Sequence, residues 1–445
     1  MYAKSMSAIA IVSLLLVATS VAQDPQTQGK ALVSDLFARQ FDKVTAQFDE
    51  RMKGALPSSK LAEMLDTILA QYGPYRTITG TREGELQGFR LVLVTCQFEK
   101  TSVNFRLAYD SNMHVAGLFY APSPPIVEWK APDYAKQSTF TEKGVTVGTG
   151  QYQLPGTLTL PQGAGPFPAV VLVHGSGPND QDETIGPNKP FKDLAWGLAS
   201  RGIAVLRYAK RTLVIAQMKE PPPAVFTVKE ETVEDAQAAV SWLAKTSAID
   251  PKRIYVLGHS LGAMLAPRIA TGDKEVAGII LMAGSTRPLE QSIVEQLKYL
   301  ATLPGKNGEE AAKLLPAAEE AAKQIQSPTL APTASINLLG ARIPGSYFLD
   351  LRDYHPAETA AGLEIAMLVL QGDRDYQVTM KDFEGWKTAL AGHSGVTFKT
   401  YPGLTHLFMP SAAPGTGPGT PDDYTKPGHV FEAVISDITS WILAK

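Results

Sequence analysis

Short, mostly apolar runs alternate with helical stretches over much of this chain. The runs lie at residues 169–173, 204–207, 253–257, 278–282, 366–370 and 397–401. A strand that is apolar on both faces must be covered on both sides, as in a parallel sheet between two layers of helices. The pattern therefore predicts an α/β domain around a mostly parallel sheet. Two further short strands are expected ahead of it, at 145–148 and 158–160.

One of these runs leads into a serine. The strand expected at 253–257 continues as Gly258-His259-Ser260-Leu261-Gly262, and a helix is expected from Ala263. A strand, a tight turn and a helix in this order lift a serine hydroxyl off the edge of a sheet. Glycines in the turn avoid clashes with neighbouring backbone, and the helix N-terminus favours developing negative charge. The context predicts that Ser260 is a nucleophile rather than a structural turn serine.

A serine hydroxyl needs a base to take its proton and a third group to hold that base. After a serine on such a turn, an acid and then a histidine are expected along the chain. The run at 366–370 leads into Gln371-Gly372-Asp373-Arg374-Asp375, so two aspartates compete for the role of the acid. The other aspartate is expected to bond its own backbone in the turn.

Three of the seven histidines follow these aspartates: His393, His406 and His429. His393 precedes the strand expected at 397–401, which places it at the opposite edge of the sheet. His429 lies at the start of the C-terminal helix. His406 lies in the loop just after the strand, where parallel strands present their carboxyl ends and functional groups gather. His406 is therefore the predicted base.

The negative oxygen formed in acyl transfer needs backbone N–H donors. One donor is expected from Leu261, directly after the nucleophile, and the other from the loop after an early strand. That loop is His174-Gly175-Ser176-Gly177-Pro178, whose small residues allow close approach of the backbone, and Ser176 is the predicted donor. Phosphate binding is the alternative interpretation, but neither G-x-G-x-x-G nor G-x-x-x-x-G-K-S/T occurs there.

Several stretches between about residue 138 and residue 445 resemble the α/β-hydrolase superfamily. The matching stretches are 173–178, 182–190 and 258–262, with the loops around residues 375 and 406. They are most similar to exported bacterial esterases of the EstD kind, which are related to dienelactone hydrolases and prolyl oligopeptidases. In such hydrolases the acid lies three residues after the glycine and three before a valine, which selects Asp375 over Asp373.

The resemblance implies a serine carboxylesterase that hydrolyses short-chain esters of small molecules through the triad Ser260, Asp375 and His406. No metal or organic cofactor is expected. Serine indicates acyl transfer, whereas a cysteine would suggest dienelactone hydrolysis and an aspartate a dehalogenase or epoxide hydrolase. The alternative enzyme is an exported serine peptidase acting on small peptides or acylated amino acids. A binding protein on a retired hydrolase scaffold is disfavoured because every expected catalytic residue is present.

An insertion from about 285 to 358 precedes the acid-bearing strand. Its middle, 308–325, is rich in Ala, Glu and Lys and is expected to be helical. Helices inserted at this point of the fold usually cover the active site, so a cap is predicted, with a solvated excursion as the alternative. The loop with Pro221-Pro222-Pro223 and the residues 207–211 are further candidates for the pocket border, although structural ion pairs are equally expected for Lys210 and Arg211.

Residues 27–121 are expected to form a separate small α+β domain. Apolar spacing indicates a helix from Lys30 to about Ala55 and another after Pro57, and β-rich runs follow at 89–98, 102–109 and 113–120. This order resembles the NTF2-like, cystatin-like domain of unknown function found ahead of hydrolase domains in some exported bacterial proteins. Spacing, packing or self-association is expected of it, with ligand binding as the alternative. The proline-containing segment 122–137 is predicted to be a linker.

The first residues predict export. Lys4 is followed by an apolar stretch at 9–18 and by the small residues Ser20 and Ala22. This is the pattern of a cleavable secretory signal, and the stretch is shorter than the roughly 20 apolar residues that span a bilayer. A signal peptide over 1–22, a secreted or periplasmic bacterial protein and no stable membrane insertion are therefore expected.

Composition limits the partners of this chain. Its 445 residues favour two domains, and 44% hydrophobic and 19% charged residues are typical of a soluble globular protein. The net charge of −3, with both signs interspersed, argues against nucleic acid as a partner, which calls for a basic face. Cys96 is the only cysteine, so it forms no internal disulfide, and it is expected to be a small buried residue within a strand.

Overall fold

A computed structural model of the protein describes residues 24–86, 89–123, 129–148, 151–218, 223–413, 415 and 417–445. The chain forms two compact units, one before residue 127 and one from residue 127 onward. Each has hydrophobic cores of its own. The predicted signal peptide over 1–22 lies outside the described residues, as do Pro221 and Pro222 of the proline tract.

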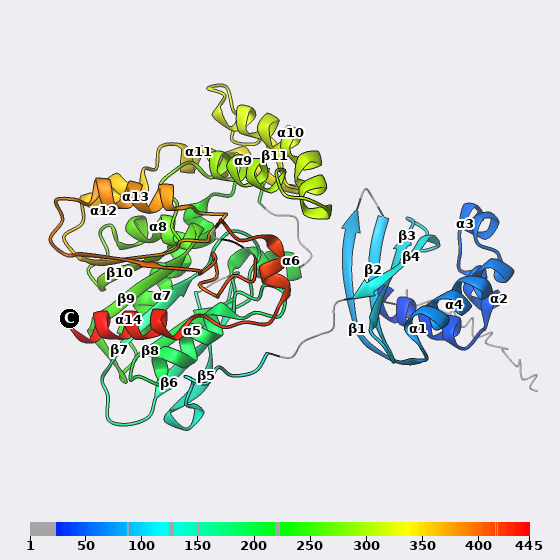
Figure 1. The fold of residues 1–445 in the computed structure, drawn as a ribbon, viewed down its shortest axis with the longest axis horizontal. Helices are drawn as coiled ribbons and strands as arrows, with labels where there is room; N and C mark the ends of the chain where they lie inside the picture. Colours follow the sequence, from blue (N-terminus) through cyan, green and yellow to red (C-terminus); the bar gives the residue numbers. More distant parts are fainter. Residues whose placement is uncertain are drawn as a thin grey trace, which may run out of the picture. The chain divides into compact units, whose positions relative to one another are not determined.

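The smaller unit consists of helices packed against an antiparallel sheet (Figure 1). Its helices are α1 (Pro25–Phe37), α2 (Phe41–Ala46), α3 (Glu50–Ala55) and α4 (Ser58–Tyr72). Its strands are β1 (Tyr75–Leu86), β2 (Phe89–Phe98), β3 (Ser102–Tyr109) and β4 (Val115–Ser123), in spatial order β1-β2-β3-β4. Burial alternates along β2, and its buried side chains share a core with Leu32, Leu36 and Leu61 of the helices. The predicted α+β class of this unit is confirmed.

Two features of the smaller unit differ from expectation. The stretch from Lys30 to about Ala55 is not one helix, because Arg39 has φ +57°, a left-handed conformation that ends α1. The side chain of Asp49 starts α3 by accepting a hydrogen bond from the Met52 N–H at 2.6 Å. Strand β1 was not predicted, since its Thr-, Gly- and Glu-rich sequence carries few apolar residues.

Cys96 lies on β2 and is fully buried in this core, as predicted. Burial raises the pKa of its thiol to about 12. The thiol therefore stays protonated at neutral pH and behaves as a small apolar side chain.

The larger unit contains a sheet in the order β14-β13-β10-β9-β7-β8-β6-β5. Its strands are β5 (Phe140–Val147), β6 (Leu154–Pro161), β7 (Phe167–Val173), β8 (Ala204–Tyr208), β9 (Ile249–His259), β10 (Val276–Met282), β13 (Ala366–Gly372) and β14 (Val396–Tyr401). The strands from β14 to β8 are parallel, whereas β6 and β5 pair antiparallel at one edge. Every apolar run expected from the sequence is a strand of this sheet.

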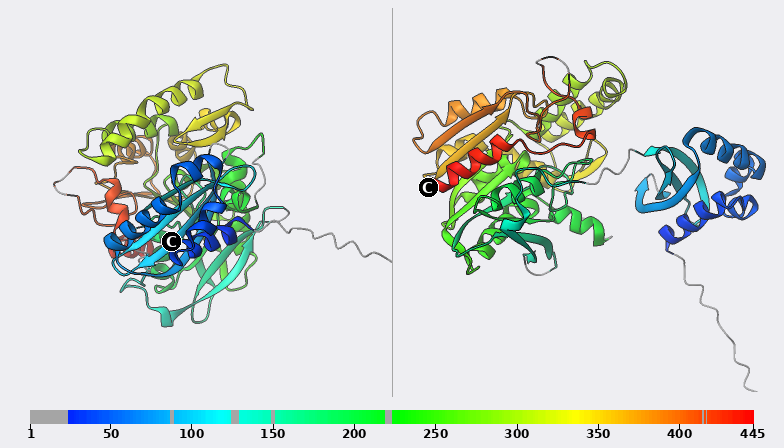
Figure 2. Two further views of the ribbon diagram at one scale, coloured as in Figure 1. Left: turned by 90° about the vertical axis from the view of Figure 1, so that its right-hand side faces the viewer. Right: turned by 60° about the horizontal axis from the view of Figure 1, so that its bottom comes forward.

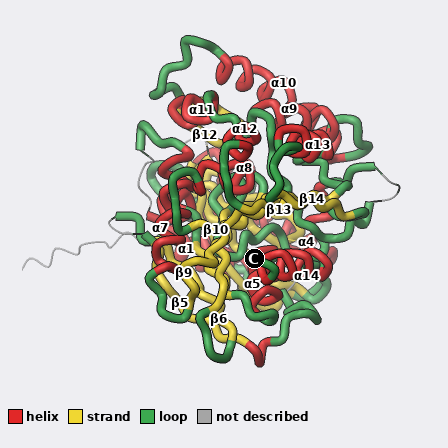
Figure 3. The backbone as a smooth tube through the Cα atoms, turned by 90° about the vertical axis from the view of Figure 1, so that its left-hand side faces the viewer, coloured by secondary structure: helices red, strands yellow, loops and turns green. Residues whose placement is uncertain are grey.

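Helices cover both faces of this sheet (Figure 3). On β7, Val171 and Val173 enter a core with α7 (Glu234–Ala244), α8 (Leu261–Ala270) and α13 (Met380–Ala389). The alternate residues Val170 and Leu172 enter the core on the other face, with α5 (Pro190–Ala199) and α14 (Glu432–Leu443). Successive side chains of a strand point to opposite faces, so one apolar run serves both cores. The predicted fold class is confirmed.

The segment between β10 and β13 forms an inserted layer whose inner side chains, among them Phe348 and Ala360, belong to the core of the larger unit. It contains α9 (Leu289–Leu300), α10 (Lys306–Gln326), the hairpin of β11 (Ser335–Leu338) and β12 (Ala341–Pro344), α11 (Gly345–Arg352) and α12 (Pro356–Ala361). Helices α9 and α10 lie side by side (Figure 2) and share a small core of Leu297, Ala311 and Ala318. Elsewhere in the larger unit lie α6 (Arg211–Met218), a π-helical turn (Lys229–Val233) and 3₁₀ turns (Gln137–Thr139 and Pro421–Thr425).

Both described ends of the predicted linker, 122–137, belong to a folded unit. Strand β4 extends to Ser123, and residues from Trp129 onward pack on the larger unit. The Trp129 indole donates a hydrogen bond to Asp193 at 3.0 Å, and the Tyr134 hydroxyl donates to the Val430 carbonyl at 2.8 Å. The sequence did not predict these contacts, because the prolines indicate a linker and the aromatic residues that pack follow no regular spacing. In the described part of the chain, the helices are all too short or too polar to cross a membrane.

Candidate active site

Ser260 lies between the end of β9 and the start of α8, on a strained turn. Its φ of +54° and ψ of −115° place a non-glycine residue in a rarely populated region, which the surrounding structure must enforce. A Cβ on Gly258 would lie 2.2 Å from the Gly262 carbonyl carbon, and one on Gly262 would lie 2.2 Å from the Val173 oxygen. Glycine is needed at both positions, because neighbouring backbone occupies the space that a side chain would take.

His406 lies beside Asp375. The two atoms His406 Nδ1 and Asp375 Oδ2 are 2.6 Å apart, and both side chains are buried. The carboxylate is held by its neighbours, since Asp375 Oδ1 accepts hydrogen bonds from the N–H groups of Gln377 (2.7 Å) and Val378 (3.0 Å). A buried carboxylate that is fully hydrogen-bonded keeps the imidazole in one orientation and one tautomer.

The competing residues have other partners. Asp373 Oδ1 accepts a hydrogen bond from the Gly403 N–H at 2.7 Å, which makes it part of a loop contact rather than a partner of His406. His393 Nε2 lies 2.6 Å from the Leu363 carbonyl oxygen. His429 Nδ1 lies 3.0 Å from Asp193 Oδ1. The structure therefore brings Asp375 and His406 together, and neither Asp373, His393 nor His429 joins them.

A pocket of about 250 Å³ contains the other predicted residues. Ser260, Leu261, Ser176 and His406 all line it, while Asp375 lies behind His406. The Gly175 backbone is close to the serine, since a Cβ there would lie 3.6 Å from Ser260 Oγ. As the first residue of α8, Leu261 has an N–H without a helical carbonyl one turn before it. The pocket thus combines a hydroxyl, an imidazole and two backbone segments able to donate hydrogen bonds.

The inserted layer supplies one wall of this pocket. Leu289, Ser292, Ile293 and Gln296 of α9 line it, together with Leu339 at the turn between β11 and β12. A second cavity, of about 300 Å³, lies next to it and shares the residues Met264 and Leu289. These two apolar side chains therefore stand between the pocket that contains Ser260 and the second cavity.

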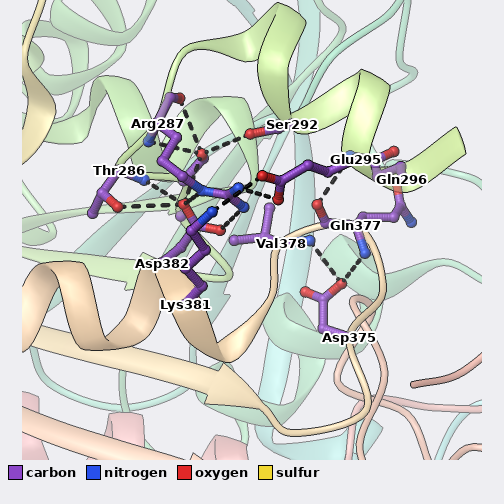
Figure 4. A network of polar contacts seen from close by, with 12 residues as sticks. Thr286, Arg287, Ser292, Glu295, Gln296, Asp375, Gln377, Val378, Lys381 and Asp382 are labelled. Atoms are coloured by element: carbon purple, nitrogen blue, oxygen red, sulfur yellow. Dashed lines mark hydrogen bonds and ion pairs between the residues drawn. The ribbon is translucent and has the colours of Figure 1, made fainter. Parts of the chain in front are cut away.

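Polar contacts tie α9 to the rest of the larger unit (Figure 4). The Arg287 guanidinium donates two hydrogen bonds to the fully buried Asp382 carboxylate of α13, at 2.9 and 2.7 Å. Arg287 also pairs with Glu295 of α9. The Gln296 amide donates at 2.9 Å to the carbonyl of Gln377, which lies two residues after Asp375 in the chain. The wall of the pocket is thereby fixed relative to the loop that holds Asp375.

The basic residues at 207–211 were candidates for the border of the pocket, but they do not line it. Among the described residues that line it there is no Arg207, Lys210 or Arg211, and no Pro223. Arg207 pairs with Asp182 at 2.9 Å, and Arg211 pairs with Asp235. Lys210 reaches the active site only from behind, where its ammonium donates to the Gly175 carbonyl at 2.7 Å. Lys210 also pairs with Glu231 at 3.4 Å, so the structural ion pairs offered as the alternative for Lys210 and Arg211 are observed.

Sequence reasoning missed a buried pair at the pocket, Glu183 and His259. Glu183 Oε2 lies 2.9 Å from His259 Nδ1. Burial by itself would raise the pKa of Glu183, but the His259 charge and hydrogen bonds lower it below its ordinary value. Burial by itself would lower the pKa of His259, but Glu183 raises it. The sequence did contain a signal for this pair, because both residues lie in stretches that resemble other hydrolases. His259 is inside the Ser260 motif, and Glu183 is inside the stretch 182–190.

Within the described ranges, no cluster of three or more His, Cys, Asp or Glu side chains is arranged to hold a metal ion. A strained serine between strand and helix, on a parallel sheet with a His–Asp pair in the same place, defines the α/β-hydrolase class. The chain belongs to that family: the α/β-hydrolase family model matches residues 170–416. Residues 30–118 match a family described as a protein of unknown function, DUF3887.

The chain is also similar to individual proteins. The chain is 40% identical to Esterase EstD of Thermotoga maritima over 412 residues, which are 92% of this chain and 93% of that protein. It is 33% identical to a polyketide transferase, ATR5, of Stachybotrys chlorohalonatus over 31% of this chain and 41% of that protein. Among solved structures it resembles Est1E from Butyrivibrio proteoclasticus, with 15% identity, 68% of this chain and 98% of that chain covered, and a TM-score of 0.46.

Proposed function

We propose that this protein is a serine carboxylesterase that hydrolyses short-chain esters of small molecules through an acyl-enzyme on Ser260. The single observation that carries the proposal is the pocket shared by Ser260 and His406, with His406 Nδ1 2.6 Å from Asp375. The name of the relative, Esterase EstD, and its coverage of nearly the whole chain support the ester as substrate.

In the first step Ser260 Oγ attacks the ester carbonyl carbon while His406 Nε2 takes the hydroxyl proton. The bond of Nδ1 to Asp375 leaves Nε2 as the basic nitrogen and stabilises the imidazolium that forms. The N–H groups of Leu261 and Ser176 donate to the oxyanion. Each such donor typically contributes about 3–4 kcal/mol to stabilising the transition state. The C–O bond to the alcohol then breaks, and the alcohol leaves with the proton from His406.

In the second step a water attacks the carbonyl of the acyl-enzyme and gives a proton to His406. The bond between the acyl group and Ser260 Oγ breaks, Ser260 recovers its proton from His406, and the carboxylic acid is released. The same imidazole and the same N–H donors serve both halves of the reaction.

The size of the pocket supports a small substrate. At about 250 Å³ it is at the lower end of what ligand pockets offer, near the roughly 300 Å³ of small sites. Its walls combine the apolar side chains of Leu289, Ile293 and Val378 with the polar ones of Ser292 and Gln296. A short acyl or alcohol group fits this mixture better than a long aliphatic chain.

A fluorophosphonate probe and two substrate classes test the proposal. We expect the probe to label wild-type protein at Ser260, and p-nitrophenyl acetate to be hydrolysed much faster than amino-acid p-nitroanilides. A protein that cleaves the anilides as well as the ester is the peptidase alternative. A protein that neither reacts with the probe nor turns over the ester is a non-catalytic scaffold.

Export to the periplasm or the exterior is also part of the proposal, because residues 1–22 have the pattern of a secretory signal. Mass analysis of the mature protein from its native compartment tests this. An intact N-terminus in the cytoplasm contradicts it. Self-association through the smaller unit is the proposed role of that unit, and light scattering of the mature protein measures it.

A further inference from the structure

Glu183 and His259 form a buried pair that contacts each catalytic segment of the larger unit. Glu183 lies in the loop between β7 and α5, and His259 is the last residue of β9, next to Ser260. Their side chains are 2% and 6% exposed. The mechanism above uses neither residue. Burying a charged pair costs desolvation free energy, and a pair of apolar residues of similar size often stabilises a protein equally well or better.

Glu183 holds the loop that carries the predicted oxyanion donor. Its Oε1 atom accepts a hydrogen bond from the Gly175 N–H at 2.7 Å. On the next peptide group, the Gly175 carbonyl accepts from Lys210 Nζ at 2.7 Å and from the Asn179 amide at 3.3 Å. The C=O and N–H of one trans peptide point in opposite directions. Fixing the Gly175 carbonyl therefore fixes the direction of the Ser176 N–H.

His259 holds the loop that carries the predicted base. Its Nε2 atom lies 2.9 Å from the His406 carbonyl oxygen, which can only accept, so Nε2 carries a proton. Its Nδ1 atom faces the Glu183 carboxylate at 2.9 Å. Nδ1 and the facing Oε2 atom make no hydrogen bond of good geometry, so the carboxylate favours the doubly protonated cation by its charge and proximity. The rings of His259 and His406 lie 4.6 Å apart, centroid to centroid.

We propose that Glu183 and His259 are positioning residues, which hold the loop at 174–178 and the His406 loop in register with Ser260. The inference rests on the proposed function, since it assigns these two residues to the same acyl-transfer site. The pair acts through its neighbours: Glu183 orients the oxyanion loop, His259 orients the base, and their mutual attraction keeps the two loops at a constant separation. Displacement of reacting groups by about 1 Å typically costs about 100-fold in rate.

The variant Glu183→Gln tests this against a matched control, Asp193→Asn. Asp193 is also fully buried, and its carboxylate also faces a histidine Nδ1 and accepts a backbone N–H, from His429 and Val430 at 3.0 Å each. It is not among the described residues that line the pocket. We expect both variants to lower the melting temperature. Only Glu183→Gln is expected to lower kcat for p-nitrophenyl acetate, by about 10- to 100-fold, with KM within about twofold.

Equal kcat for wild type and Glu183→Gln overturns the proposal, and so does an equal loss of kcat in Asp193→Asn. The rate of fluorophosphonate labelling is measured on the same samples. A wild type that is not labelled overturns the proposed function itself, whereas a labelled wild type with an unaffected Glu183→Gln overturns only the positioning role. If Glu183→Gln does not fold, His259→Gln replaces it with the same expected loss of kcat.

A second measurement reads the protonation of His259 on the wild type itself and uses a variant only to assign signals. ¹⁵N spectra of histidine-labelled protein, with the His259 signals assigned by the His259→Gln variant, report the protonation of each ring nitrogen. The carboxylates that act on His259 are Glu183 and Asp375, and the titratable ring of His406 lies 4.6 Å from its own. We expect both nitrogens of His259 to carry protons at pH 8, well above the ordinary pKa of about 6.5. A neutral ring at that pH overturns the charged pair.

Discussion

In the proposed mechanism Ser260 becomes reactive through the residues that surround it, and two aspartates show how specific that arrangement is. Asp375 and Asp373 are separated by one residue in the chain, yet only Asp375 contacts His406. Asp373 instead accepts the Gly403 N–H. The difference lies in the direction that the turn after β13 gives to each side chain.

This difference leads to a prediction for the acid. Asp375→Asn should lower kcat by about 10⁴-fold, because an amide holds His406 in the wrong tautomer. Asp373→Asn is the matched control, and its kcat should stay within about threefold of wild type, because the loop contact to Gly403 lies outside the reaction. Steady-state hydrolysis of p-nitrophenyl acetate measures both. A larger loss in Asp373→Asn would mean that the acid is Asp373.

The glycines of the Ser260 turn lead to a second prediction at this scale. Gly262→Ala should destabilise the larger unit by about 1–3 kcal/mol or more, since the new methyl group would lie 2.2 Å from the Val173 carbonyl oxygen. Gly144→Ala on β5 is the control, because no atom within 4 Å meets a Cβ there. Chemical denaturation followed by fluorescence compares the two. Equal stability of both variants would contradict the close approach of backbone at the turn.

At the scale of elements, α9 decides the shape of the pocket, and its anchor is the buried contact between Arg287 and Asp382. Arg287→Ala should cost about 3–5 kcal/mol, because it leaves the Asp382 carboxylate, 0% exposed, without its cation. Lys381→Ala is the control, because Lys381 pairs with the same Glu295 at 3.1 Å but is exposed to solvent, and such pairs contribute about 1 kcal/mol or less. Denaturant unfolding measures both, and similar losses would contradict the special role of Arg287.

The same helix leads to a prediction about chain length. Leu289→Ala should join the catalytic pocket to the neighbouring cavity of about 300 Å³, because Leu289 lines both. The ratio of kcat/KM for p-nitrophenyl octanoate to kcat/KM for the acetate should rise by about 10-fold. A single additional methylene group that a pocket accepts typically raises kcat/KM by about 10-fold or more. Leu314→Ala, on the exposed face of α10, is the control and should leave the ratio unchanged. An unchanged ratio in Leu289→Ala would mean that the two cavities do not communicate.

At the scale of the whole molecule, the boundary of the larger unit lies before Trp129 rather than after Gln137. Removing residues 23–126 should leave esterase activity, because Trp129 and Tyr134 keep their bonds to Asp193 and Val430. Removing residues 23–137 should lower the melting temperature of the product relative to the shorter deletion, because it leaves the buried Asp193 carboxylate with one donor fewer. Thermal unfolding and p-nitrophenyl acetate hydrolysis compare the two. Loss of activity in a folded 127–445 product would mean that the smaller unit contributes to catalysis.

Much of the fold was predictable because it depends on local periodicity. Runs that are apolar on every residue became parallel strands, since only a sheet covered on both faces buries such a run. The same reasoning missed β1, whose alternating polar sequence resembles a loop, and it joined α1 to α3 across Arg39. A single left-handed residue ends a helix without disturbing the apolar spacing on either side of it.

For the site, the sequence by itself determined the turn that carries the predicted nucleophile, because Gly258, Ser260 and Gly262 meet their steric requirements within one short segment. It narrowed the acid to two aspartates and the base to one loop. Only the tertiary structure decided that Asp375 faces His406, that α9 supplies the pocket wall, and that Glu183 meets His259. These contacts join residues 31 to more than 70 positions apart, and their energies depend on burial and direction, which no local pattern in a chain encodes.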